Sequence, residues 1–159
     1  MADKNSYLPA VQDLIHRYVH LVDDDKLEAL PDLFVEQASY RIISRRSHEQ
    51  GQVIGILQCD SRAMLRDRIA SMRRANIFEP HRYRHMVSAT LIEALDADGT
   101  LHVATNYYVT RIMEGGSFEL FSTGVYRDTI IQQDGEWLFR ERLVVCDSTR
   151  IDSLLVIPI

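Results

Sequence analysis

Apolar residues recur at helical spacing near the beginning of the chain. Between positions 11 and 22 they lie three or four residues apart, which leaves one side of a helix to be buried. Aspartates follow at 23–25, and a second apolar cluster at 27–34 predicts a short helix whose regularity Pro31 limits. The pattern therefore predicts a helical hairpin. The apolar positions of the first helix are Val11, Leu14, Ile15, Tyr18, Val19 and Val22.

A strand and a third helix are predicted next. Residues 40–44 are rich in β-forming side chains, and residues 47–55 form a polar stretch that ends in glycine, typical of a loop. Asp60 or Ser61 can cap the third helix, and Pro80 marks its far limit. Its inward-facing line is expected to be Leu65, Ile69 and Met72.

The second half of the chain changes to a β pattern. Three turn signals, at 98–99, 115–116 and 134–135, separate four long β-rich runs, which predicts an antiparallel meander. Strands of this length twist and curve. The runs cover residues 84–95, 101–112, 118–131 and 137–146.

Helices followed by a meander are typical of an α+β fold. A curved antiparallel sheet packed on N-terminal helices forms a cone, the shape of the nuclear transport factor, scytalone dehydratase and ketosteroid isomerase proteins. We expect residues 1–159 to form one such domain. The architecture by itself does not choose a function, because some cone proteins catalyse reactions and others only bind partners.

Composition supports an ordinary globular protein. The chain has 159 residues, of which 46% are hydrophobic and 26% charged. Residues 1–10 are polar and lack a signal-peptide pattern, and no apolar run approaches membrane-spanning length, so we expect a cytoplasmic protein. Cys59 and Cys146 belong to no paired spacing, which argues against a disulfide framework and a cysteine metal site.

The basic residues are mostly arginine. Only Lys4 and Lys26 are lysines, and many arginines lie between positions 62 and 84. Nucleic acid is not the expected partner, because the formal net charge is −5 and acidic residues are interspersed. The arginines therefore indicate either an ion-paired surface or a subunit interface.

Histidine pairs raise the question of a metal site. His81 and His85 are four residues apart, but their context is β-rich rather than helical, and no glutamate of the metalloprotease motif lies between them. His16 and His20 share a helical face without an evident third ligand. We therefore predict that this chain binds no metal. A Rieske cluster is also not expected here, because it needs two cysteines and two histidines in paired motifs.

No familiar catalytic signature is present in the sequence. The nucleophile, phosphate-loop and dinucleotide motifs are all absent. Acid–base chemistry inside a cone stays open as an alternative, in a free-standing isomerase or dehydratase of a small cyclic substrate. Its candidate groups are Tyr18, His16, Asp24, His85 and Asp147.

The order of short motifs along the chain resembles the small, or beta, subunits of aromatic-ring-hydroxylating dioxygenases. The resemblance spans nearly the whole chain and is most similar to subunits of oxygenases for aromatic acids such as terephthalate or salicylate. The matching stretches are Asp24, 33–34, 40–41, 67–77, 81–85, 126–128, 137–142, 146–149 and 157–159.

This resemblance implies a complex of three large and three small subunits, with the small subunits associating as a trimer. The large subunit would bear the Rieske iron-sulfur cluster and the mononuclear iron, whereas this chain would support assembly and have neither catalytic nor cofactor-binding residues. In the family's fold, the arginines around Tyr83 lie near the end of the last strand. The apolar tail also needs cover from its own sheet or from a neighbour. The expected interface residues are Arg82, Arg84, Asp147, Arg150, Leu155 and Ile157.

Overall fold

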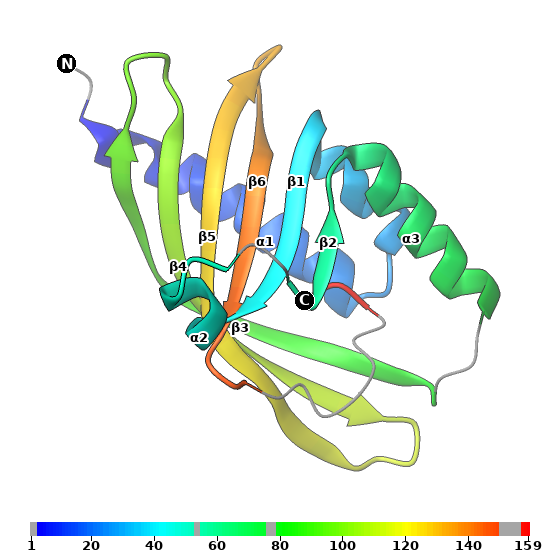
Figure 1. Ribbon diagram of the computed structural model, residues 1–159. Helices are drawn as coiled ribbons and strands as arrows, with labels where there is room; N and C mark the ends of the chain where they lie inside the picture. The colour runs from blue at the N-terminus through cyan, green and yellow to red at the C-terminus, as the bar shows by residue number, and fades with distance from the viewer. Residues whose placement is uncertain (1–2, 53–54, 76–78, 150–156) are drawn as a thin grey trace.

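A six-stranded, strongly curved sheet dominates the computed structural model, which describes residues 3–52, 55–75, 79–149 and 157–159 (Figure 1). The strand order is β2-β1-β6-β5-β4-β3. The strands are β1 (Phe34–Ser44), β2 (Leu57–Cys59), β3 (His81–Leu95), β4 (Leu101–Met113), β5 (Phe118–Gln133) and β6 (Glu136–Cys146). The helical elements are η1 (Lys4–Tyr7), α1 (Leu8–Asp23), η2 (Leu27–Leu33), α2 (Arg45–Glu49) and α3 (Arg62–Ala75).

The predicted α+β cone is confirmed. Strands β3 to β6 form the expected antiparallel meander, and α1 crosses one face of the sheet (Figure 1). The predicted face of α1 is buried, and Leu65, Ile69 and Met72 are the buried residues of α3. The hydroxyl of Ser61 accepts a hydrogen bond from the backbone N–H of Met64 at 3.1 Å, which caps that helix.

Two local predictions were wrong. The stretch 47–55 is not a plain loop, because residues 45–49 form α2, whose first turn is capped by the Ser44 hydroxyl. The first strand also extends back to Phe34 and joins the meander by parallel pairing with β6, while β2 pairs with its other edge. Neither pairing has a local sequence signal, because partners far apart in the chain form it.

Arginines on α3 bind acidic groups of the helical hairpin. Arg73 donates to Asp25 at 2.9 Å and to Glu28 at 2.7 Å, and Arg66 donates to Asp32 at 2.9 Å. The Arg73 guanidinium lowers the pKa of the Glu28 carboxyl below its ordinary value. The ion-paired alternative therefore holds for these two arginines, which fasten α3 to the hairpin.

A fully buried ion pair lies between β5 and β6. Nε and Nη2 of Arg142 donate to the two carboxylate oxygens of Asp128 at 2.9 and 2.7 Å, and both side chains are 0% exposed. Burial raises the pKa of Asp128 above its ordinary value, and the Arg142 guanidinium opposes that rise. The guanidinium also lies 4.0–4.2 Å from the ring centroids of Tyr18, Tyr126 and Phe139. These contacts join α1 to the two central strands.

The end of the chain lies inside the cone. Ile157 and Ile159 are 6% and 0% exposed and belong to the hydrophobic core. The carbonyl oxygen of Ile159 accepts hydrogen bonds from the hydroxyls of Tyr18 at 3.0 Å and Tyr40 at 2.8 Å. The Ile159 N–H donates to the Tyr40 hydroxyl at 3.1 Å. For these described residues, the expected packing of the tail on its own sheet is confirmed.

We predict that Arg142→Met destabilises the protein by about 3–5 kcal/mol, because it leaves the Asp128 carboxylate buried without a counterion. The matched control is Arg127→Met on the same strand pair, since Arg127 forms a solvent-exposed pair with Glu93 at 3.3 Å. That control should change stability by at most about 1 kcal/mol. Urea unfolding of both variants measures the difference. Equal losses would contradict the role given to the buried pair.

We predict that Tyr40→Phe destabilises the protein by about 1–3 kcal/mol, because both backbone groups of Ile159 lose a buried partner. Tyr7→Phe is the control, since Tyr7 is only partly buried and contacts Trp137 through its ring. It should change stability by less than about 0.5 kcal/mol. Thermal unfolding monitors both variants. A Tyr40→Phe protein as stable as the control would show that these hydrogen bonds do not hold the tail.

Candidate functional site

Arg82 and Arg84 project from the face of β3 that is turned away from the core. Their neighbours Tyr83 and His85 are buried on the inner face, so the arginines point outward by strand alternation. The Arg84 side chain is 58% exposed, and its Nη1 lies 3.8 Å from Oδ2 of Asp23. Arg82 has no ion-pair partner among the described residues.

Large apolar side chains surround these arginines on the outer sheet face. Strand register places Arg84 opposite Thr110, which lies opposite Leu120, while Arg82, Ile112 and Phe118 form the next row. Leu120 is 64% and Phe118 76% exposed. We call this surface the outer patch, and its members are Arg82, Arg84, Met86, Tyr108, Ile112, Phe118 and Leu120.

The outer patch has the composition of a subunit interface. Aromatic residues, methionine and arginine are enriched at interface cores, and exposed apolar clusters on one face indicate a binding surface. Its two arginines were predicted from the sequence, and its apolar members were not. The available signal was strand alternation, because Met86, Tyr108 and Leu120 occupy outward positions where a solvent-facing strand normally carries polar residues.

The other predicted interface residues lie elsewhere. Asp147 follows β6 and binds Arg45 and the hydroxyl of Thr123, the latter at 2.9 Å, so its partners are not Arg82 or Arg84. Ile157 is 6% exposed and packs in the core of its own chain, and its role at an interface stays a prediction. Arg150 and Leu155 lie outside the described residues.

An acid–base pair lies on the inner face, between the end of α1 and β3. Oδ1 of Asp23 is 2.5 Å from Nδ1 of His85, and Oδ2 accepts the backbone N–H of His85 at 2.9 Å. The His85 side chain is 0% exposed. His85 was among the acid–base candidates predicted from the sequence, but the aspartate predicted at the end of the helix was Asp24 and not Asp23. The missed signal was spacing, since Asp23 follows the buried Val19 by four residues and therefore lies on the same helix face.

The remaining acid–base candidates do not converge with this pair. Tyr18 is occupied by Tyr40 and Ile159, and burial raises the pKa of its hydroxyl. His16 is solvent-exposed on α1, and Asp24 forms an ion pair with Lys26 at 3.4 Å. Among the described residues, Asp23 and His85 are thus the buried acid–base pair of the inner face.

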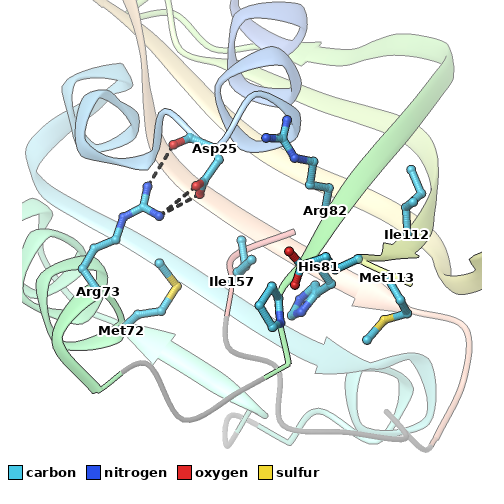
Figure 2. A pocket seen from close by; sticks show the side chains of 10 residues that line it. Asp25, Met72, Arg73, His81, Arg82, Ile112, Met113 and Ile157 are labelled. Atoms are coloured by element: carbon cyan, nitrogen blue, oxygen red, sulfur yellow. Dashed lines mark hydrogen bonds and ion pairs between the residues drawn. The ribbon is translucent and has the colours of Figure 1, made fainter. Parts of the chain in front are cut away.

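A hollow of about 390 Å³ opens between α3 and the beginning of β3 (Figure 2). Its lining includes Met72, His81 and Ile157 together with Arg82 and Ile112 of the outer patch, and the Arg73–Asp25 pair closes one side. Nδ1 of His81 lies 2.8 Å from the backbone carbonyl oxygen of Glu79.

Within residues 3–52, 55–75, 79–149 and 157–159, no group of three or more His, Cys, Asp or Glu side chains is arranged to hold a metal ion. No helix in the same residues combines the length and apolar character needed to cross a membrane.

Comparison with known proteins places the chain in a family. The model of the SnoaL-like domain matches residues 8–143. The anthranilate 1,2-dioxygenase small subunit of Burkholderia cepacia is 36% identical over 92% of this chain and 90% of its own length. Subunit beta 1 of the terephthalate 1,2-dioxygenase terminal oxygenase component of Comamonas sp is 39% identical over 89% of this chain and 92% of its own length.

Solved structures agree with these relatives. A structure described as the beta subunit of an aromatic-ring-hydroxylating dioxygenase from Novosphingobium aromaticivorans has a TM-score of 0.86 and 30% identity, with 95% of each chain covered. The benzoate 1,2-dioxygenase beta subunit of Burkholderia mallei shares the fold, with a TM-score of 0.73 and 19% identity. The match covers 91% of this chain and 93% of that subunit. The chain therefore belongs to the SnoaL-like family and, within it, to the small subunits of aromatic-ring-hydroxylating dioxygenases.

Proposed function

We propose that this chain is the assembly subunit of a cytoplasmic dioxygenase for an aromatic acid and has no active site for the oxygenation itself. Its partner is a large subunit that holds the Rieske cluster and the mononuclear iron, in a complex with three copies of each subunit. The named relatives support the substrate class, because anthranilate and terephthalate are both aromatic acids.

The outer patch is the observation that carries the assembly role. Leu120 and Phe118 are more than half exposed, beside the exposed Arg84 and beside Arg82, which has no ion-pair partner among the described residues. Desolvating such a cluster against another subunit gains free energy in proportion to the apolar area buried. We therefore place the contact with a neighbouring subunit of the complex on this face, with Arg82 and Arg84 inside it.

The filled interior also supports a structural role. In a cone enzyme the substrate would occupy the inside of the sheet, but Ile157 and Ile159 are packed into the core of this chain. The Tyr18 hydroxyl, an acid–base candidate, is engaged with the carbonyl oxygen of Ile159. The hydroxyls of Tyr18 and Tyr40 thus have protein partners.

One observation favours a second function. Asp23 and His85 form a buried pair in which a carboxylate orients an imidazole, an arrangement that enzymes use for general-base catalysis. A free-standing cone isomerase or dehydratase would use this pair. The two functions predict different results when the outer patch is altered. The assembly role predicts that the complex is lost, whereas the catalytic role does not.

We predict that Leu120→Asp reduces recovery of the complex with a co-expressed large subunit at least about tenfold, because it places a charge in a desolvated apolar contact. The reaction rate per assembled iron centre should stay unchanged. Copurification with a tagged large subunit, followed by turnover normalised to iron, gives both quantities.

The matched control is Met64→Asp, which alters a side chain that is 45% exposed on another element, α3. It should leave recovery of the complex unchanged. Normal assembly of Leu120→Asp would remove the outer patch from the interface. Intact assembly with abolished turnover would favour a catalytic role for this chain.

A further inference from the structure

Asp23 lies at the edge of the sheet, where one side chain can contact residues from both faces of β3. That strand is the outermost one in the sheet order. The Asp23 side chain is 3% exposed and lies at the end of α1. Its Oδ2 accepts the backbone N–H of His85 at 2.9 Å and also lies 3.8 Å from Nη1 of Arg84. One buried carboxylate therefore contacts both the backbone of the strand and an arginine of the outer patch.

The contacts with His85 hold this carboxylate in place. Its Oδ1 lies 2.5 Å from Nδ1 of the His85 ring, so each carboxylate oxygen has a partner on the same residue. An acidic side chain in the last turn of a helix opposes the helix dipole, so α1 itself does not favour Asp23 at this position. The contacts with β3 therefore account for the position of this aspartate.

The ion pairs around the end of α1 connect Arg84 to Asp23. The two aspartates that follow, at 24–25, are bound by other cations, Lys26 and Arg73. Among the described residues, the ion-pair partner of Arg84 is Asp23. The counterion of this surface arginine is thus a buried group and not another surface side chain.

An arginine that is held before its partner arrives can bind that partner at a lower entropic cost. Its long side chain loses rotamer freedom when an interface fixes it, and prior ordering removes part of that loss. The contact with Asp23 is made through Nη1 of Arg84. Because a guanidinium has five N–H donors, donors remain for an acceptor on another molecule.

We propose that Asp23 is a positioning residue for assembly, an inference that rests on the proposed function. Asp23 holds Arg84 in the orientation in which the outer patch binds an acidic group of the neighbouring subunit. Asp23 is buried and acts only through the arginine. The inner pair of Asp23 and His85 is then the fixed support of a surface contact.

The test is a double-mutant cycle of Asp23→Asn and Arg84→Gln. The readout is the ratio in which a tagged variant and the untagged, unaltered chain enter complexes with a limiting amount of large subunit. Asp23→Asn should lower its own share about two- to fivefold, the range expected of a partly exposed ion pair. In the Arg84→Gln background it should change the share by less than about 1.5-fold, because the residue that it positions is gone. An equal loss in both backgrounds would mean that Asp23 is merely structural and would overturn the proposal.

Arg82→Gln provides the matched control. Arg82 lies on the same face of β3 and has no ion-pair partner among the described residues. Asp23→Asn should therefore keep its full effect in the Arg82→Gln background. Loss of that effect in both arginine backgrounds would mean that Asp23 does not act through Arg84, and the proposal would fail.

A measurement on the unaltered chain covers the case in which Asp23→Asn fails to fold. Relaxation of the ¹⁵N resonances of the arginine Nε groups reports how ordered each side chain is on the ps–ns timescale. The order parameter of Arg84 should exceed that of Arg82. Equal order parameters for the two arginines would overturn the positioning role.

Leu120→Asp separates a failure of this proposal from a failure of the proposed function. If Leu120→Asp loses the complex while Asp23 and Arg84 are uncoupled, the positioning role fails and the assembly role stands. If Leu120→Asp assembles normally, the outer patch is not the interface, and the positioning role fails together with the proposed contact.

Discussion

The ion pair between Arg142 and Asp128 is the interaction on which the centre of the cone depends. Two opposite charges with no exposure to solvent are tolerable only because the geometry is bidentate and the arginine lies against three aromatic rings. The pair joins β5 to β6, and Tyr18 brings α1 to the same point. The same tyrosine also contacts the end of the chain. The Arg142 guanidinium thus lies where α1, β5 and β6 meet, and Tyr18 links this point to Ile159.

This arrangement divides the inside of the cone into two parts. At the charged centre, Tyr18, Tyr40 and the last residues satisfy one another, so the interior is occupied by protein. Beside it, at the end of α1, Asp23 binds both the backbone N–H and the ring Nδ1 of His85. The filled centre fits a subunit whose purpose is assembly.

Strand β3 gives its two faces different tasks. Its inward residues Tyr83 and His85 build the interior, whereas Arg82, Arg84 and Met86 contribute to the outer patch. Alternate residues of a strand point to opposite faces, yet Arg84 lies 3.8 Å from Asp23, so the two sets of residues meet at the end of α1. Under the proposed function the outer patch contacts a neighbouring subunit, and the Asp23–His85 pair lies on the inner side of the same strand.

The sequence by itself determined the elements whose signals are local: the apolar line of α1, the cap and inward face of α3, and the meander between its turn signals. It also indicated the family through the order of its motifs. Only the tertiary structure decided the parallel pairing of β1 with β6, the partner of Arg142, and the meeting of Asp23 with His85 across 62 positions. The physical reason is that periodicity reports which face of an element is buried. Which buried groups face each other depends on the curvature and register of the whole sheet.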